Sequence, residues 1–520
     1  MVKLNRHNVN KKGVYGMGRL KHHNVSTALV LLVCMVFLFG ACSSGQPSQT
    51  AVTTTAAAPS TSAEATTAAV DNEYKNDLGM YTLQGELNAA PQAASMSDKK
   101  ITLTGWMTPM WTVVDEKVTN GKKMTLEEFL NETMKRFASS YSGANIAEVV
   151  VENIPGKDRD EKISVAMSAG ALPDFIYESF FAVSSRAHDG LFLTLDDIID
   201  DAAKTDMPSS IWNAVKIANS VYCYPFTQGL NFMGYNADMF KQAGLDKYIA
   251  GKNELAFWTP DQLTEICTAI KKTVGVDPIV FGCKSANADT WFLKYIRMFG
   301  GEWFDQNGMV IANNPTTVKG LEYIVDLKNK GLTNSNPEST EGADSRTQLM
   351  NKLCAIGLMG GSNLSSFWAD MESGKIESFD LRAAYVPGTE KCVSTYVQGF
   401  SAFNTGKNEN MRAAKDYIKW VNSNSVLLEE SRWMVPVRNS VFEKYIDFNP
   451  MFKAYKEASD YAIDFSNNSV SYTELRNTLY PQLQAAFTGM KTPQQTMDDY
   501  TAAANKIIEE GMKKSVALKR

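Results

Sequence analysis

The chain has 520 residues, of which 21% are charged and 44% apolar, so it is too long for one compact core and is expected to fold as two domains with tails. Residues 1–41 hold six Lys or Arg and no acidic residue, which leaves 46 basic against 57 acidic residues, a net charge of −11, in the remainder. An acidic body without a basic run excludes a typical nucleic-acid-binding surface.

The N-terminal segment has the pattern of an export signal. A basic stretch is followed by an uncharged apolar run at residues 28–41, which is short for a bilayer span and typical of the hydrophobic region of a signal peptide. The run ends in Gly40-Ala41-Cys42, which resembles the bacterial lipobox, where small residues precede a cysteine that becomes lipidated. Residues 1–41 are therefore predicted to be a signal peptide and Cys42 the lipidated residue, with an ordinary signal peptide as the alternative.

A spacer is predicted after Cys42. Residues 43–70 are rich in Ser, Thr, Ala and Pro and carry one charge, Glu64, so they lack the apolar surface that a folded core needs. Residues 42–98 are interpreted together as a lipidated N-terminus and flexible tether that precedes the folded body.

Alternating strands and helices are predicted from residue 99 onward. The predicted strands span residues 101–106, 147–154, 172–177, 279–283, 355–359 and 381–386. Helices are predicted behind the caps at Thr125, Thr259 and Thr492 and over residues 157–170, 291–299, 315–330 and 411–422. Strands separated by helices of this length predict mostly parallel α/β sheets with helices on both faces.

The stretch 221–246 indicates a passage between two domains. An apolar run through Pro225 is followed by Gly229 and by a second short strand that ends at Asn236. Asn236 is positioned to cap a helix that stops at Gly244. The pattern predicts a strand, a glycine, a second strand and a helix.

Histidine and cysteine are poorly placed for catalysis or metal binding. His188 is the one histidine outside the N-terminal segment, so multi-histidine zinc sites are excluded, and it is interpreted as a surface loop residue. The cysteines form no C-x-x-C pair, and most of those after Cys42 are interpreted as buried small apolar residues, with one or two disulfides left open. No metal site, cofactor or catalytic residue is predicted.

The chain resembles family 1 extracellular solute-binding proteins of ABC importers, the maltose-binding-protein-like group. Residues 235–245 match the family's Tyr-Asn-x-Asp-x-Phe-x-x-Ala-Gly-Leu segment, and Tyr224-Pro225 matches its hinge pair. Weaker matches follow in the family's order at residues 168–174, 190–197 and 258–260. The resemblance implies a two-lobed periplasmic-binding-protein-like α/β fold of class II type with hinge crossings. Lobe 1 is expected to comprise residues 99–226 plus 400–438, and lobe 2 residues 227–399 plus 439–520.

The resemblance also implies where a ligand binds, at strand ends and crossings between the lobes. The predicted ligand-binding residues are Trp106, Trp111, Glu178, Phe180, Tyr224, Gln228, Asp289, Trp291, Ser362, Asn363 and Trp433. Aromatic faces stack on the apolar side of a sugar ring while polar side chains satisfy its hydroxyls. Three other tryptophans are interpreted as core residues: Trp212, Trp258 and Trp420.

The function implied by the resemblance is capture of a carbohydrate, an oligosaccharide, for delivery to ABC transporter permease subunits. The protein is expected to be a monomer, exported and anchored by lipid to the outer face of the bacterial cell membrane, and not an enzyme. Two alternatives remain open. One is a non-sugar solute such as a peptide or polyamine, since the acidic body slightly favours neutral or cationic ligands. The other is a cell-surface glycoside hydrolase, for which a carboxylate pair can always be proposed among 57 acidic residues.

Overall fold

A computed structural model describes residues 99–108, 125–156, 158–423, 431, 434–464 and 466–519, without the side chains of residues 129, 291 and 362. The predicted signal peptide, Cys42 and the spacer lie outside these residues. Within the described part of the chain, no helix is both long enough and apolar enough to cross a membrane.

Lobe 1 is built on three parallel strands, β1 (Lys100–Met107), β2 (Asn145–Asn153) and β3 (Phe175–Ser179), in the order β2-β1-β3. Its helices are α1 (Leu126–Ser140), α2 (Arg159–Ala169), α3 (Phe180–His188), α4 (Asp201–Asp206), α5 (Ser209–Asn213) and α12 (Asn408–Ser423). A short 3-10 turn, η2 (Asp196–Ile198), and the hairpin β4 (Lys216–Ile217) and β5 (Ser220–Val221) complete it. The predicted capping box at Thr125 is present, and Gly170 ends α2 with φ of 64°.

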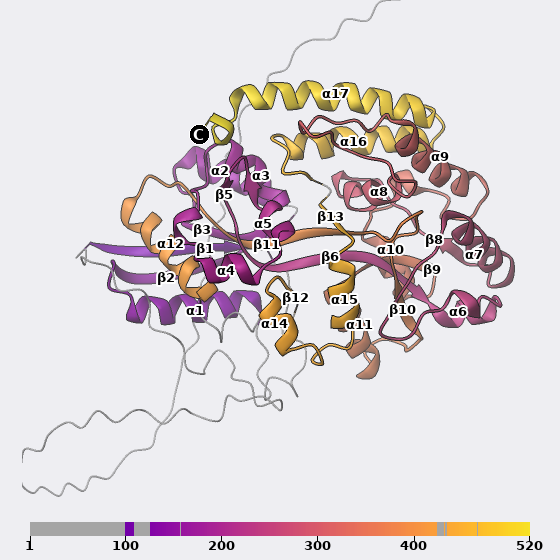
Figure 1. The fold of residues 1–520 in the computed structure, drawn as a ribbon, viewed down its shortest axis with the longest axis horizontal. Helices are drawn as coiled ribbons and strands as arrows, with labels where there is room; N and C mark the ends of the chain where they lie inside the picture. The colour runs from indigo at the N-terminus through magenta and orange to yellow at the C-terminus, as the bar shows by residue number, and fades with distance from the viewer. Residues whose placement is uncertain are drawn as a thin grey trace, which may run out of the picture. The chain divides into compact units, whose positions relative to one another are not determined.

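Two long antiparallel strands carry the chain between the lobes (Figure 1): β6 (Tyr224–Asn236) and β11 (Val393–Ala402). The prediction of two short strands around Gly229 is wrong, because β6 is one continuous strand of 13 residues, buried throughout. A third short crossing strand, β12 (Val435–Pro436), pairs with β6. Because these crossings pair antiparallel with β3 and β9, the sheet is mixed where they enter it.

Lobe 2 surrounds the other half of β6. Its strands are β7 (Leu255–Ala256), β8 (Asp277–Ile279), β9 (Cys354–Gly360) and β10 (Leu381–Ala384). Its helices are α6 (Ala237–Gln242), α7 (Pro260–Thr273), α8 (Asp289–Tyr295), α9 (Pro315–Asn329), α10 (Asp344–Met350) and α11 (Gly361–Glu372), with 3-10 turns η3 (Asp246–Tyr248), η4 (Ala286–Ala288) and η5 (Pro337–Ser339). Asn236 caps α6 by accepting from two backbone amides, as predicted, and the capping box at Thr259 is present.

The segment after residue 433 is more ordered than the sequence suggests. No helix or strand was predicted between residue 422 and the cap at Thr492, but residues 434–464 contain β12, α14 (Asn439–Lys444), α15 (Phe452–Ser459) and β13 (Ala462–Asp464). The Tyr455 hydroxyl donates to the carbonyl oxygen of Gly361 at 3.0 Å, and β13 pairs with β11. This segment therefore packs against lobe 2 beneath the crossing strands.

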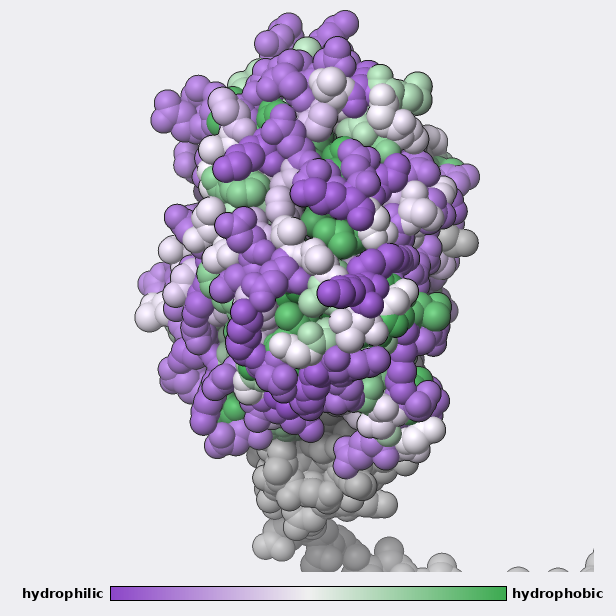
Figure 2. Space-filling view, turned by 90° about the vertical axis from the view of Figure 1, so that its right-hand side faces the viewer, coloured by the Kyte–Doolittle hydropathy of each residue, from purple (hydrophilic) through white to green (hydrophobic). Residues whose placement is uncertain are grey.

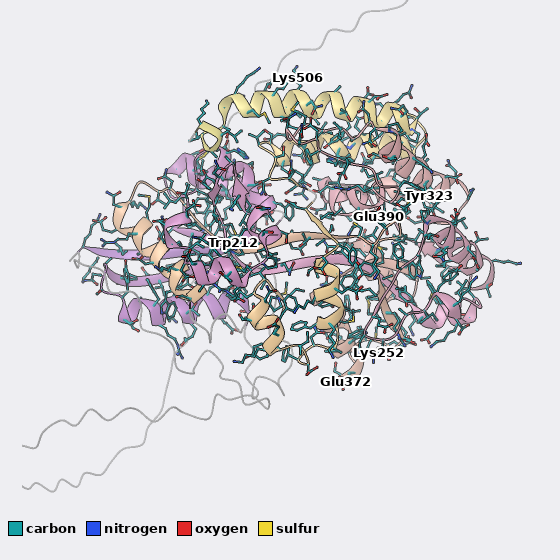
Figure 3. The ribbon with its side chains drawn as sticks, in the orientation of Figure 1. Trp212, Lys252, Tyr323, Glu372, Glu390 and Lys506 are labelled. Atoms are coloured by element: carbon teal, nitrogen blue, oxygen red, sulfur yellow. The ribbon has the colours of Figure 1, made fainter. Side chains whose placement is uncertain are left out.

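Three clusters of buried side chains form the cores. The lobe 1 cluster draws on residues 101–226 and 397–437, and the two lobe 2 clusters lie on either face of β6, with Leu230 and Phe232 on one face and Met233 and Tyr235 on the other. Trp212, Trp258 and Trp420 are all buried in these clusters, as predicted, and Figure 3 shows Trp212 among the elements of lobe 1. The predicted lobe boundaries remain a prediction.

The C-terminal helices return from lobe 2 to lobe 1. After α16 (Tyr472–Phe487), α17 (Pro493–Lys514) runs toward α2 and α3 and ends in the turn η7 (Ala517–Lys519) (Figure 1). Ala517 packs in the lobe 1 cluster, although residues up to 520 were assigned to lobe 2. The chain thus joins its lobes a fourth time.

His188 lies inside this C-terminal contact. The interpretation as a surface loop residue is wrong, because His188 is buried at the end of α3. Its Nε2 donates to the carbonyl oxygen of Asn468 at 3.0 Å, and its Nδ1 lies 2.9 Å from the Ser515 hydroxyl. Burial lowers the pKa of His188, which favours the neutral ring. The histidine therefore links α3 to two segments of the C-terminal region.

The cysteines after Cys42 are free thiols in the structure. Cys223, Cys267, Cys283 and Cys354 are buried, as predicted, and Cys392 is partly buried. Burial raises the pKa of Cys392 to about 11, so the thiol is protonated at neutral pH.

The surface on the side of α6, α7 and α9 is mainly hydrophilic. Figure 2 views this side and shows apolar residues scattered singly or in small groups rather than gathered in one large patch. Scattered apolar residues are normal for a soluble protein surface.

Candidate functional site

The carboxyl ends of strands from both lobes converge beside β6 and β11, the paired strands that run between the lobes. β1 and β3 end here from lobe 1, at Met107 and Ser179, and β9 ends here from lobe 2, at Gly360. Asn231 of β6 pairs with both Gly360 and Ser394, which places the end of β9 beside the crossing. Strand ends in α/β folds are where ligand-contacting side chains gather.

Glu178 lies on the lobe 1 side of this region. It is 3% exposed, and its Oε2 accepts hydrogen bonds from the Thr108 hydroxyl and from Arg159 Nη1, the latter at 3.2 Å. Its Oε1 accepts from the backbone amide of Ser179 at 2.6 Å. Arg159 reaches it from the first turn of α2. The carboxylate is therefore held rigidly in position as an ion pair.

Phe181 projects from lobe 1 against lobe 2. It is partly buried and packs on the lobe 2 cluster, although it lies in the first turn of α3, two residues after the lobe 1 strand β3. Its ring lies 5.7 Å from that of Tyr396 and 6.1 Å from that of Tyr472, both edge to face. The guanidinium carbon of Arg476 lies 5.6 Å from its centroid. Phe181 is thus a direct apolar contact between the lobes.

Tyr396 lies on the crossing itself. It pairs in register with Gly229, and a Cβ on that glycine would lie far closer to Cζ of the tyrosine ring than van der Waals contact allows. Burial raises the pKa of Tyr396, so the hydroxyl is neutral at physiological pH and can donate or accept a hydrogen bond. The absence of a side chain at Gly229 lets the ring lie across the strand.

Polar side chains form the lobe 2 wall. Arg346 of α10 donates from Nη1 to the amide oxygen of Asn363 at 2.8 Å. A Cβ on Gly360 would lie 3.2 Å from the Asn363 amide oxygen and 3.5 Å from that of Asn231, so both amides meet at the end of β9. Together with Glu178, Phe181 and Tyr396, these three polar residues are called the junction cluster: Glu178, Phe181, Asn231, Arg346, Asn363 and Tyr396.

The structure brings two of the predicted ligand-binding residues, Glu178 and Asn363, into the junction cluster. Trp106 and Phe180 are buried in the lobe 1 core instead, Trp106 beneath α2 with Lys162 Nζ 5.1 Å from its ring. Tyr224 is buried with its ring edge toward Trp212, and burial raises its pKa to about 12. Ligand contact by these side chains stays a prediction.

The remaining predicted residues lie elsewhere or are not described. Gln228 donates from its amide to the carbonyl oxygen of Pro436 at 3.1 Å, which ties β6 to β12. Asp289 accepts from Arg476 and Tyr472 in lobe 2. Predicted residues that lie outside the described residues, or whose side chains do, are Trp111, Trp433, Trp291 and Ser362.

The predicted ligand-binding residues did not include Phe181, Tyr396 and Arg346. For Phe181 a signal was available in the sequence. β3 ends and α3 begins after Ser179, and side chains no longer alternate between two faces once a strand becomes a helix. Tyr396 has no local sequence pattern that marks it as a contact residue. Arg346 lies on a short helix of seven residues that the sequence pattern did not predict.

The carboxylates of this region are paired with arginine. Glu178 is held by Arg159, and Asp289 by Arg476 at 2.7 Å. Among the residues that the structure describes, no group of three His, Cys, Asp or Glu side chains is placed to hold a metal ion. The arrangement offers rings, amides and guanidinium groups, which suit recognition of a polar solute by hydrogen bonding and stacking.

Comparison with known proteins agrees with this arrangement. Residues 123–426 match the family described as bacterial extracellular solute-binding protein. An uncharacterized ABC transporter extracellular-binding protein of Pyrococcus horikoshii is 23% identical over 64% of this chain and 69% of its own. The arabinooligosaccharide-binding protein of Bacillus subtilis is 25% identical over 52% of this chain and 64% of its own, less than two thirds of that relative's length.

The fold is also that of a solved sugar-binding protein. The maltose-bound structure of MalE3 from T. maritima superposes with a TM-score of 0.63 at 18% identity, covering 78% of this chain and 99% of MalE3. This likeness shows the two-lobed α/β fold. Because the family match covers more than half of the sequence, the chain belongs to the bacterial extracellular solute-binding proteins.

Proposed function

We propose that the chain is a receptor that binds an oligosaccharide at the junction cluster and delivers it to the permease of an ABC importer. The observation that carries this proposal is the meeting of Phe181 and Tyr396 with the amides of Asn231 and Asn363 where β6 and β11 cross between the lobes. The relatives named for arabinooligosaccharide and maltose binding support a carbohydrate as the solute.

The position of the junction cluster supports a mechanism based on lobe closure. Glu178 and Phe181 come from lobe 1, whereas Asn231, Arg346 and Asn363 come from lobe 2 or its half of β6. A solute that contacts both walls gains its full set of hydrogen bonds only when the lobes approach each other, so it binds the closed form better than the open form. The permease then distinguishes loaded from empty receptor by the relative position of the lobes.

The proposal is tested by calorimetric titration of the full-length chain, purified in mild detergent, with arabino- and malto-oligosaccharides, acidic oligosaccharides, peptides and polyamines. Binding of one oligosaccharide class, weakened about tenfold or more in Tyr396→Ala, is expected because a stacking surface is lost. The control is Tyr248→Ala, which removes another partly buried tyrosine of lobe 2 beyond the far end of β6. Binding of only peptides or polyamines would replace the sugar assignment, and release of shorter sugars during incubation would indicate the hydrolase alternative.

We further propose that Cys42 carries a lipid that anchors the receptor, as a monomer, to the outer face of the cell membrane. The support is the sequence Gly40-Ala41-Cys42 at the end of an apolar run, followed by a spacer of low charge. Replacing Cys42 with Ala in a bacterial host should move the exported chain from the membrane fraction to the soluble fraction, as measured by immunoblotting after fractionation. Unchanged recovery with membranes would contradict lipid anchoring at this residue.

A further inference from the structure

Arg346 differs from the other arginines at the lobe junction in its partners. It is partly buried, and its hydrogen bond in the structure goes to the neutral amide oxygen of Asn363 at 2.8 Å. Within the described residues, no carboxylate lies within 4 Å of its guanidinium nitrogens. By contrast, Arg159 is paired with Glu178, and Arg476 with Asp289.

The acidic residues nearest to Arg346 along the chain are engaged elsewhere. Asp344, on the same helix, accepts from the backbone amide of Glu341 at 3.2 Å. Glu341 in turn accepts from the Ser285 hydroxyl at 2.7 Å and lies 3.8 Å from Lys284 Nζ. Neither carboxylate is directed to the guanidinium of Arg346.

Within the described part of the chain, the positive charge of Arg346 has no counter-ion. Burial lowers the pKa of Arg346, and its neighbouring ionisable group is Tyr396, whose own pKa is raised by burial, so that it supplies no negative charge at neutral pH. Glu178 also faces Tyr396 but is paired with Arg159 on the lobe 1 side. An arginine that is partly removed from water without a counter-charge lowers the stability of the free protein.

We propose that Arg346 pairs with a carboxylate of the bound solute, so that the receptor takes an acidic oligosaccharide containing a uronic acid. The proposal rests on the function proposed above. A guanidinium presents parallel N–H donors that match the two oxygens of a carboxylate. Arg346 Nη1 donates to Asn363, and this hydrogen bond fixes the orientation of the guanidinium, whose other N–H groups can donate to the ligand.

The location of Arg346 agrees with this role. It lies on the same side of the junction as Asn231 and Asn363, near the carboxyl end of β9, and it lies near Tyr396. A sugar ring stacked on Tyr396 would direct a substituent toward Arg346. The acidic character of the whole chain does not oppose an anionic ligand, because at close range the charge of the contacting group dominates and distant surface charges are screened by salt.

The experiment compares matched ligands on the full-length chain in mild detergent. Oligogalacturonides, oligoglucuronides and oligomannuronides are titrated as free acids and as methyl esters, which keep the sugar and remove the charge, beside neutral oligosaccharides. We expect one acid to bind about 100-fold more tightly than its ester, and Arg346→Gln to reduce this preference to about fivefold or less. Equal binding of acid and ester, or tight binding of neutral sugars that is unaffected by Arg346→Gln, overturns the acidic-ligand inference and leaves the sugar receptor intact. Absence of binding to every carbohydrate overturns both proposals.

A second measurement needs no ligand. Arg346→Met should raise the melting temperature of the free protein by about 2 °C, because it removes an uncompensated charge. The matched control, Arg476→Met, should lower it, because Asp289 then loses its partner. If Arg346→Met lowers the melting temperature as much as Arg476→Met does, Arg346 is a structural residue and the inference fails.

Discussion

Replacing Gly229 with alanine should destabilise the protein by about 3 kcal/mol, because the new methyl group collides with the ring of Tyr396 in a packed region. The ring cannot move aside freely, since Phe181 lies 5.7 Å away and itself packs on the lobe 2 cluster. Urea unfolding followed by fluorescence gives the change in free energy of unfolding. A change below about 0.5 kcal/mol would show that the ring yields easily.

A second substitution tests whether that collision is the cause. In the background of Tyr396→Ala, Gly229→Ala should cost less than about 1 kcal/mol, because the clashing ring is gone. Gly399→Ala is the matched control on the opposite strand, where the new Cβ would meet the backbone carbonyl of Tyr224. No side-chain substitution relieves that contact, so the cost of Gly399→Ala should persist in the Tyr396→Ala background. Equal costs of Gly229→Ala in both backgrounds would refute the proposed collision.

The parts of the fold that were predicted from the sequence depend on short-range interactions. The side chains of Thr125, Thr259 and Thr492 each accept a hydrogen bond from the backbone amide three residues later. The Glu or Gln side chain at that position accepts a hydrogen bond from the backbone amide of the threonine. Asn236 likewise caps α6 with its own side chain. The atoms involved are neighbours in the sequence, so the residue types alone identify the start of each helix.

The errors concern interactions between distant segments. Gly229 was interpreted as a break between strands, but β6 continues through it. Its lack of a side chain leaves room for the ring of Tyr396 on the neighbouring strand. His188 was interpreted as exposed, but Asn468 and Ser515 from the C-terminal region cover it. No local sequence pattern around either residue identifies the distant residues that contact it.

The candidate site was predicted in part for the same reason. Glu178 and Asn363 were named from the family resemblance, and both lie in the junction cluster. Phe180 was predicted to contact the ligand, but Phe181 makes the contact between the lobes. The change from strand to helix after Ser179 shifts by one the residue that faces lobe 2. Arg346 stands out only once its neighbours are known, since an arginine without a paired carboxylate looks like any other in a sequence.

Replacing Asp289 with alanine should destabilise the protein by about 3 to 5 kcal/mol, because Arg476 would remain largely buried without its counter-charge. Asp289 is 1% exposed and lies 2.7 Å from Arg476 Nε, and it also accepts from the Tyr472 hydroxyl at 2.7 Å. Replacing both partners, as Asp289→Leu with Arg476→Met, should recover most of the loss. Asp326→Ala, which breaks an exposed pair with Lys330, should change the free energy of unfolding by less than about 0.5 kcal/mol.

The same variants separate two roles for Asp289, which the family resemblance assigns to ligand contact. If its carboxylate serves only the ion pair, the double variant regains stability and binds the solute as the wild-type chain does, once both are compared under folded conditions. If Asp289 also contacts the solute, the double variant regains stability but binds at least about tenfold more weakly in titration calorimetry. A stable Asp289→Ala variant with lost binding would contradict the structural role, because a carboxylate that holds a buried arginine cannot be removed without a large cost in folding.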